Sequence, residues 1–224
     1  MPFQLSKIDI KKVQERYTAR HKTHGNLPET LGWNKGRQIP RFQSLTGSFS
    51  LQNISVLDIG CGFGDLIPYL EKHGSIKSYL GIDLVPSLIT DAQNIHKEEK
   101  YKFKCCDFLA TEIDDSFDLV LGSGIFNFKL ESGNNWDFIT TTLEKAFKLS
   151  TTGISFNFLS DQVDYEKPLN YHSSPKQVLD FSYSLTKRLI LRNDLMPFEF
   201  TLTLFKDQSP DRESGLFKPL VGLK

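Results

Sequence analysis

The stretch VLDIGCGFGD, residues 56–65, decides the fold class. An apolar run ends in Asp58, and glycines follow at positions 60, 62 and 64. Alternating glycines directly after a buried strand are typical of a sharp turn into a helix, because glycine lacks the Cβ that would block the turn or keep a ligand away. The free N–H groups of the next helix then point into the same space. This corner predicts an α/β domain with a ligand site at the end of its first strand.

Strands and helices alternate after this corner. We expect strands at 54–59, 78–83, 101–105, 117–122, 153–159, 186–192 and 198–206, and helices at 64–73, 86–97, 135–149 and from 175. Ser174 and Pro175 form a helix start of the capping-box type, and an Asn-Asn pair precedes the helix at 135–149. Only NDLMP, residues 193–197, separates the last two strands, so they must form an antiparallel hairpin. Repeated β-α units predict a mostly parallel sheet with helices on both faces.

The first 50 residues have a different character, and we expect residues 1–50 to be a helical arm or lid on a domain of residues 51–224. A helix at 7–20 capped by Ser6, a polar loop at 21–35 and a second helix near 36–47 are predicted. Residues 1–43 carry nine basic and three acidic side chains. The arm either lies on a more acidic body or meets an anionic substrate or a cofactor carboxylate, for which Arg37 and Arg41 are candidates.

Composition excludes several classes of function. Lys+Arg and Asp+Glu are equal at 27 each, and this balance disfavours broad nucleic-acid binding. With no 18-residue apolar run and no secretory signal, we expect a cytoplasmic protein without a membrane partner. The three cysteines form no C-x-x-C pattern and are expected to be reduced and mostly buried. His21 and His24 have no clustered ligands beside them, so no metal site is predicted.

The glycine spacing indicates which ligand the corner holds. Dinucleotide-binding loops read G-x-G-x-x-G, whereas here the glycines alternate and Asp65 follows them. Carboxylates at Asp58 and Asp65 would repel a pyrophosphate and suit the positive ammonium and sulfonium of S-adenosylmethionine. Asp83 ends the second strand, 19 residues after Gly64, where a carboxylate can accept hydrogen bonds from ribose hydroxyls.

Residues 56–65 resemble motif I of the class I S-adenosylmethionine-dependent methyltransferases, and the terminal hairpin resembles the end of their seven-stranded Rossmann-like sheet. The resemblance implies strand order 3-2-1-4-5-7-6 with the last strand antiparallel, and S-adenosyl-L-methionine as cofactor with S-adenosyl-L-homocysteine as product. It also implies that Asp107 binds the adenine amino group beside Phe108. The implied cofactor residues are Asp58, Gly60, Cys61, Gly62, Gly64, Asp65, Asp83, Leu84, Asp107, Phe108, Ser123, Gly124 and Arg37.

The acceptor is a separate question. The segment GSGIFNF, residues 122–128, stands where enzymes that methylate base amino groups or glutamine carry an Asn/Asp-Pro-Pro-aromatic signature, and no Pro-Cys nucleophile is present. Both differences disfavour a nucleobase acceptor. Side chains at the ends of the fourth and fifth strands are candidates to orient the acceptor or to accept its proton. They are Asn127, Asn157, Asp161, Tyr165, Tyr171 and His172, of which we name His172, Tyr171 and Asn127 as catalytic candidates.

Residues 25–42 resemble an N-terminal segment of uncharacterised bacterial and archaeal methyltransferases often encoded near polysaccharide genes, and residues 123–130 and 171–175 match more loosely. We therefore predict methyl transfer to an O or N atom of a small polar metabolite, with a sugar as first candidate. The alternatives are an RNA-modifying enzyme whose arm binds phosphates, and a non-catalytic nucleoside- or partner-binding module on the same fold. A nicotinamide dehydrogenase is disfavoured by the glycine spacing and the hairpin. The oligomeric state stays open.

Overall fold

The computed structural model describes residues 3–33 and 37–217. The elements are, in chain order, α1 (Lys7–His24), α2 (Gln38–Thr46), β1 (Ile54–Ile59), α3 (Leu66–His73), β2 (Ile76–Asp83), α4 (Pro86–Ile95), β3 (Tyr101–Cys105), β4 (Phe117–Gly122), α5 (Asn135–Leu149), β5 (Ser150–Leu159), α6 (Pro175–Ser182), β6 (Leu189–Arg192) and β7 (Glu199–Phe205). No helix in this described part is long and apolar enough to cross a membrane.

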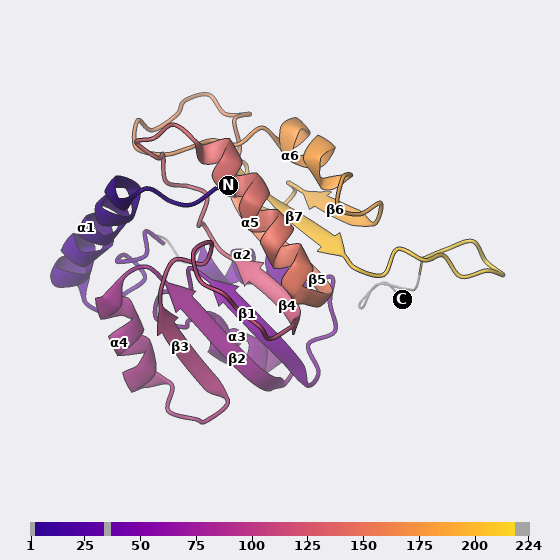
Figure 1. The fold of residues 1–224 in the computed structure, drawn as a ribbon, viewed down its shortest axis with the longest axis horizontal. Coiled ribbons are helices and arrows are strands. Elements are labelled where there is room, and N and C mark those ends of the chain that lie inside the picture. Colours follow the sequence, from indigo (N-terminus) through magenta and orange to yellow (C-terminus); the bar gives the residue numbers. More distant parts are fainter. Residues whose placement is uncertain (1–2, 34–36, 218–224) are drawn as a thin grey trace.

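The seven strands form one sheet of order β3-β2-β1-β4-β5-β7-β6, which confirms the predicted topology (Figure 1). Neighbours from β3 to β5 run parallel, and β7 is antiparallel to both β5 and β6. The strand order reverses between β1 and β4, because β1 connects onward to β2 on one side while β4 connects to β5 on the other. Ligands of open α/β sheets bind at such a reversal, outside the carboxyl ends of the strands.

Helices cover both faces of the sheet (Figure 1), and each face has its own apolar cluster. Side chains of α5 and α6 pack on one face, including Leu143 and Val178. Side chains of α2 and α3 pack on the other face, including Leu45 and Leu70. All four are fully buried. Because α2 supplies core side chains, this part of the arm is fixed to the sheet by hydrophobic burial, worth about 1.5–3 kcal/mol for each large side chain.

Helix α1 is held differently. Its buried residue is Asp9, whose side chain is 0% exposed. The Asp9 carboxylate accepts a hydrogen bond from the Glu131 N–H at 2.7 Å, while the Ser6 hydroxyl caps the helix by accepting from the Asp9 N–H at 3.1 Å. Polar contacts, and not a buried apolar face, therefore fasten the start of α1 to the segment before α5.

Several local expectations were wrong. Helix α1 continues to His24, past the predicted end at residue 20, since the chain has no helix breaker before Gly25, which takes a φ of 58°. Asn134 makes no side-chain cap for α5. The cysteines are free as expected, but Cys61 alone is buried, whereas Cys105 is exposed and Cys106 is half-buried. The Ser174 cap of α6 is confirmed.

Three aromatic rings stack beneath the ends of the central strands. Phe126 follows β4, Phe158 is on β5 and Phe200 is on β7. The ring centroids of Phe126 and Phe158 are 4.9 Å apart, and those of Phe158 and Phe200 are 4.8 Å apart. Such pairs contribute about 0.5–1.5 kcal/mol each beyond their buried area. The stack gives the segment after β4 a rigid base.

Candidate active site

A cavity of about 1000 Å³, its mouth included, lies at the carboxyl ends of β1, β2, β3 and β4. We call it the strand-end cavity. The predicted cofactor residues that line it are Gly60, Asp83, Leu84, Asp107, Phe108, Ser123 and Gly124.

The glycine corner adopts the conformation that the sequence predicts. Gly60, Gly62 and Gly64 all take positive φ values, of 72°, 55° and 77°. A Cβ on Gly60 would collide with the Ile125 side chain, and one on Gly62 would lie 2.9 Å from Leu31. Glycine is therefore required here both for the backbone conformation and for the close approach of neighbouring side chains.

The Asp83 carboxylate ends β2 at the wall of the strand-end cavity. One of its oxygens accepts from the Gly62 N–H at 3.0 Å, and the other accepts from the Val85 N–H at 2.9 Å. Burial raises the pKa of Asp83, although these backbone hydrogen bonds oppose the shift. A carboxylate has about four acceptor positions. Two bonds leave lone pairs free, so Asp83 fits the predicted role of accepting hydrogen bonds from two ribose hydroxyls.

Two hydroxyls in the same lining have no partner among the described residues. They belong to Ser123, after β4, and Thr142, on α5, and both oxygen atoms are buried. Buried polar groups are normally hydrogen-bonded, so these hydroxyls fit a ligand that carries polar atoms. Sequence reasoning missed Thr142, because a threonine inside a helix carries no signal of a ligand contact.

Other predicted cofactor residues lie outside the lining of the strand-end cavity. Asp58 accepts a hydrogen bond from the Tyr79 hydroxyl at 2.6 Å within the core, and burial raises its pKa to about 7. Asp65 accepts from the Gln38 amide at 2.7 Å. Both carboxylates therefore have protein partners, and neither lines the strand-end cavity, so their contact with a positively charged ligand stays a prediction. The remaining members of this group are Cys61, Gly62, Gly64 and Arg37.

The arm covers the strand-end cavity. Leu5, Val13, Tyr17, Leu31 and Trp33 contribute to its lining. Figure 1 shows α1 beside α4, over the edge where β2 and β3 end. Apolar and aromatic arm side chains thus form a wall over a floor that the strand ends provide.

Two further cavities continue from this wall. A connecting cavity of about 800 Å³ shares Tyr17, Trp33 and Gly124 with the strand-end cavity. A loop cavity of about 1100 Å³ lies beyond it and again includes Trp33. The three spaces therefore adjoin one another around the Trp33 indole. Lining residues of the two further cavities that the sequence did not single out are Arg16, Arg20, Lys167, Asn170 and Glu199.

His172 lines the loop cavity. Its Nδ1 lies 2.6 Å from the Ser160 carbonyl oxygen. A carbonyl only accepts, so Nδ1 carries the proton, and Nε2 of the neutral ring is then left with a free lone pair. That Nε2 atom is buried and has no hydrogen-bond partner among the described residues. The Ser160 contact therefore leaves Nε2 as the nitrogen that can accept a proton, in a residue that lines the loop cavity.

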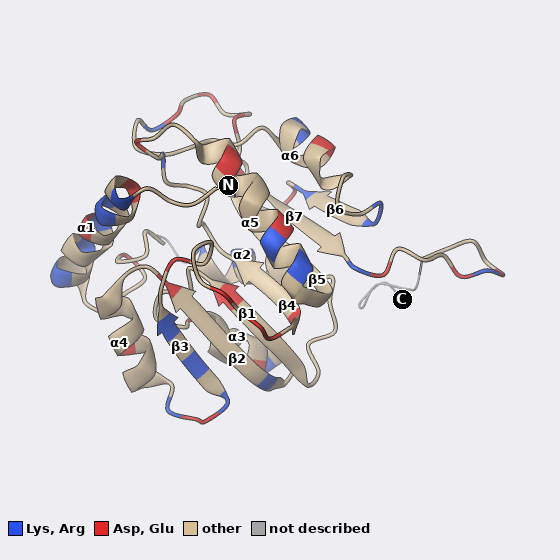
Figure 2. Cartoon of the chain, viewed as in Figure 1, with Lys and Arg blue, Asp and Glu red and all other residues tan. Residues whose placement is uncertain are grey.

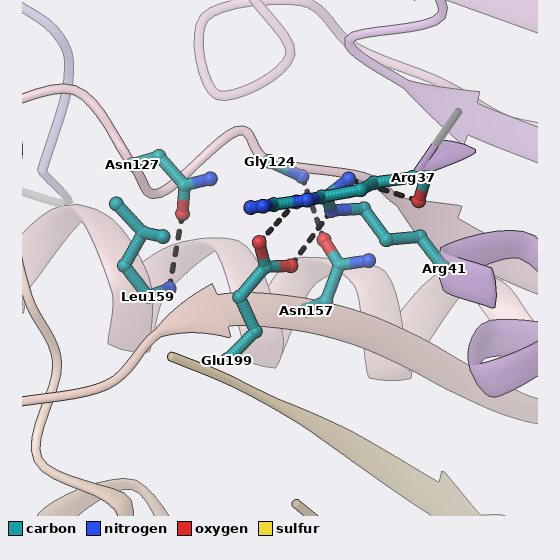
Figure 3. Close-up of polar contacts among 7 residues, drawn as sticks. All are labelled: Arg37, Arg41, Gly124, Asn127, Asn157, Leu159 and Glu199. Carbon is teal, nitrogen blue, oxygen red and sulfur yellow. Dashed lines mark hydrogen bonds and ion pairs between the residues drawn. The ribbon is translucent and has the colours of Figure 1, made fainter. Parts of the chain in front are cut away.

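The other acceptor candidates occupy different places. Asn127 lines the connecting cavity, and its side-chain oxygen accepts from the Leu159 N–H at 3.1 Å. The buried Asn157 accepts from the Gly124 N–H at 2.8 Å and so fixes the turn after β4 (Figure 3). Tyr171 packs against the core and lies outside the linings of the three cavities, while Tyr165 lines the loop cavity.

Arg41 is not free to bind an anion, as the sequence suggested it would be. Its guanidinium forms a two-armed ion pair with Glu199 at the start of β7, with one arm at 2.7 Å (Figure 3). It also donates to the Arg37 carbonyl at 2.9 Å and lies 4.1 Å from the centre of the Trp33 ring. This buried pair ties α2 to the sheet and holds Trp33 in place.

The known proteins that this chain resembles are methyltransferases. A family model described as "Methyltransferase domain" matches residues 56–146. The Mycobacterium tuberculosis protein Rv1506c, whose name assigns it provisionally to the methyltransferases, is 32% identical over 158 residues, 68% of this chain and 93% of that protein. A malonyl-[acyl-carrier protein] O-methyltransferase of Acetivibrio thermocellus is 26% identical over 95 residues, 42% of this chain but only 34% of its own length.

Solved structures with low identity share the fold. Magnesium protoporphyrin IX methyltransferase from Synechocystis PCC 6803, solved with bound S-adenosylhomocysteine, superposes with a TM-score of 0.63 at 12% identity, covering 89% of this chain and all of that one. The N-methyltransferase NodS from Bradyrhizobium japonicum, also with S-adenosylhomocysteine, gives 0.61 at 18% identity, covering 87% and 99%.

Proposed function

This chain belongs to the class I S-adenosylmethionine-dependent methyltransferases, and from that premise we propose that it methylates an oxygen or nitrogen atom of a small polar metabolite, with sugars as the first class to test. S-adenosylmethionine supplies the reactive methyl group on its sulfonium when bound. The chain must bring the acceptor close to that group and keep water away.

The junction at Trp33 and Gly124 carries this proposal. Both residues line the strand-end cavity and the connecting cavity. A cofactor in the first space and an acceptor in the second would therefore meet at the same wall. The Asn157 side chain holds the Gly124 N–H, and the Arg41 guanidinium stacks on Trp33, so both sides of the junction are fixed in position.

We assign His172 as the general base of the transfer. His172 lines the loop cavity, and its Nε2 has no hydrogen-bond partner among the described residues, so this atom can accept the proton that a hydroxyl or ammonium acceptor gives up once the acceptor reaches it. Asn127, at the connecting cavity, is proposed to orient the acceptor. Tyr171 is proposed as a positioning residue, because its N–H donates to the Asn127 carbonyl at 3.1 Å and so holds the His172 loop against the segment after β4.

We further propose that residues 1–50 act as a lid on the domain of residues 51–224. The arm supplies one wall of the strand-end cavity, so movement of α1 and the segment 25–33 would widen the path for ligand exchange. Support comes from the way the start of α1 is attached, through the bond between the Asp9 carboxylate and the Glu131 N–H. Further along the helix, Tyr17 packs against a small apolar cluster that includes Phe63 and Val85. A segment with few buried apolar side chains opens more easily than the core of the sheet.

An RNA acceptor is the second candidate, because α1 exposes Lys7, Lys11 and Lys22 to solvent (Figure 2). Binding through such a surface would weaken steeply with salt. The half-buried Arg16 and Arg20 of the same helix line the connecting cavity instead, and this placement favours a ligand small enough to enter it.

Two linked measurements test the proposal. Calorimetric titration with S-adenosylhomocysteine, with NAD⁺ as control, reports the cofactor site. Release of S-adenosylhomocysteine across a panel of sugars, amines and RNA reports the acceptor. We expect His172→Gln to lower kcat by about 10²–10⁴-fold without changing S-adenosylhomocysteine affinity. His73→Gln, at an exposed histidine on α3, serves as the matched control. Equal kcat for the two variants would remove His172 from the mechanism.

A further inference from the structure

We propose that the methyl acceptor carries a negatively charged group, a carboxylate or a phosphate, which binds to a cluster of cations around the connecting and loop cavities. This inference deepens the proposed function and rests on it. The cluster consists of Arg16, Arg20, Arg37 and Lys167, and we call it the cation cluster.

The charge balance of the two linings is the first observation. None of the four cations forms an ion pair with another described residue. Glu199 is the carboxylate in both linings, and the Arg41 guanidinium already neutralises it. The described walls of the two cavities therefore present a surplus of positive charge, and concave walls of low dielectric strengthen the field of such a surplus.

The cations come from three separate parts of the chain. Arg16 and Arg20 lie one turn apart on α1, Arg37 directly precedes α2, and Lys167 is on the loop between β5 and α6. Repulsion among like charges makes such a gathering unfavourable by itself. The convergence is therefore consistent with a place where an anion compensates the charge.

Two of these cations lie against aromatic rings, which restrain their side chains. The guanidinium of Arg16 lies 5.6 Å from the Phe128 ring centre, and that of Arg20 lies 6.0 Å from the Tyr17 ring centre. Such stacking restrains the side chain and leaves the N–H donors at the guanidinium edge free to bind oxygen atoms. Phe128 and Tyr17 also line the strand-end cavity, so these charges lie next to the place where the cofactor is expected.

His172 gives an independent indication of a ligand. Its buried Nε2 has no partner among the described residues, and the ring lines the same loop cavity as Arg37 and Lys167. An acceptor whose anionic end contacts this part of the cation cluster would present a hydroxyl or amine beside the imidazole and toward Trp33. A neutral acceptor would leave the half-buried Arg16 and Arg20 without a counter-charge from the ligand.

The test uses the full chain saturated with S-adenosylhomocysteine, so that the cofactor site is measured first and separately. Calorimetry then compares glucuronate and glucose 1-phosphate with neutral glucose, and malonate and inorganic phosphate serve as anions without a sugar. The variant is the double replacement Arg37→Gln with Lys167→Gln. The matched control replaces the exposed Lys102 and Lys104 of β3 by Gln, which removes the same charge from the opposite edge of the sheet.

We expect at least one of these anions to bind about tenfold more tightly than glucose, and the Arg37 and Lys167 replacements to lower that affinity about tenfold or more, with S-adenosylhomocysteine affinity unchanged. The control should bind like the unmodified chain. If S-adenosylhomocysteine binds but no anion does, or if variant and control bind the anions equally, the inference is overturned while the proposed function stands.

Two further outcomes also decide. If the double replacement weakens S-adenosylhomocysteine itself, the cations serve the cofactor carboxylate and the inference is wrong. If a short single-stranded RNA binds in a cluster-dependent way while the small anions do not, the acceptor is a nucleic acid and the small-molecule inference fails. Failure of S-adenosylhomocysteine to bind at all would instead remove the proposed function.

Discussion

The strand-end cavity and the loop cavity are built from different materials. The first takes its floor from residues at the ends of neighbouring strands of one sheet. Backbone hydrogen bonds hold this floor in shape, such as those from the Gly62 N–H to Asp83 and from the Gly124 N–H to Asn157. The second takes its walls from side chains of α2, β7 and the loop after β5. Substitutions in the first region should therefore disturb ligand binding through backbone shape, and those in the second through charge.

The two regions meet in a single set of contacts. The Arg41 guanidinium forms an ion pair with Glu199 on the sheet and stacks on Trp33. Among the described residues, it pairs with no other carboxylate. Because Trp33 lines both cavities, this pair is the point where a change in one region can reach the other. The predictions below separate the regions, in order of expected effect.

The largest loss of stability is expected for Glu199→Ala. Both partners of the Arg41–Glu199 pair are at least nine-tenths buried, so the replacement leaves an uncompensated charge, at a cost of about 3–5 kcal/mol in the free energy of unfolding. Urea denaturation measures it. Replacing the pair together by Met and Leu should restore most of the loss. The exposed Lys176–Asp180 pair is the control, and Asp180→Ala should cost less than about 0.5 kcal/mol. Similar losses for the two single variants would contradict this account.

The second effect concerns pH and the buried Asp58 carboxyl of β1. Burial raises the pKa of Asp58 to about 7, so the native protein holds a proton that the unfolded chain releases. Because unfolding then releases this proton, the free energy of unfolding falls as the pH rises from about 4 to about 7. Asp58→Asn removes this pH dependence. The free energy of unfolding of the variant, measured against that of the unmodified chain, should therefore rise by about 2–4 kcal/mol between pH 5 and pH 8.

Urea denaturation at the two pH values tests the Asp58 prediction. Asp118 is the control: hydrogen bonds from Ser55 and Thr151 outweigh its burial and lower its pKa. Asp118→Asn should show no such gain at pH 8. An unchanged pH dependence in Asp58→Asn would show that this carboxyl is ionised throughout the range.

A third substitution tests the shape of the glycine corner. Gly60→Ala forces a Cβ into the Ile125 side chain at a positive φ, and we expect a loss of about 1–3 kcal/mol together with at least tenfold weaker S-adenosylhomocysteine binding. Gly133 has a similar φ of 74° but open space around it. Gly133→Ala should carry the conformational cost alone and leave binding unchanged. Equal affinities in calorimetry would mean that the corner does not contact the cofactor.

The smallest effect is expected at the contact that fastens the start of α1, between Asp9 and Glu131. Asp9→Ala removes the bond to the Glu131 N–H and should cost about 1–2 kcal/mol, with about fivefold faster S-adenosylhomocysteine release. Stopped-flow fluorescence of Trp33 can follow the release, with a Trp136→Phe background to isolate the signal. Lys11→Ala, at an exposed residue of the same helix, is the control. Identical release rates would count against a lid.

The sequence predicted the strand-end cavity, whose shape follows from backbone conformation, better than the loop cavity, whose walls are side chains from distant parts of the chain. The sheet order and the strand-end positions of Asp83 and Asp107 follow from local patterns, because a strand followed by glycines restricts the chain to few conformations. The Arg41–Glu199 pair joins residues 158 positions apart, and no local pattern indicates such a contact. The same holds for the convergence of Arg20 and Lys167 in one cavity.

The position of Asp58 relative to the strand-end cavity has a signal in the sequence. Successive side chains of a strand point to opposite faces. Ile59 lines the strand-end cavity, so its neighbour Asp58 must point to the other face, where the Tyr79 hydroxyl binds it. Alternation along β1 thus places the Asp58 carboxylate on the face away from the strand-end cavity. The predicted attraction between Asp58 and a positively charged ligand did not take this alternation into account. For His172 the sequence suggested the residue, but only the Ser160 contact shows which nitrogen is free.

The most direct test of two cavities joined at one wall is a crystal structure of the complex with S-adenosylhomocysteine. The account predicts the adenosine between Asp83 and Asp107 and the homocysteine sulfur facing Trp33 and Gly124. The connecting cavity, and the loop cavity with His172, should be left open for the acceptor. Density for the ligand in the loop cavity, or a sulfur directed away from Trp33, would contradict the account.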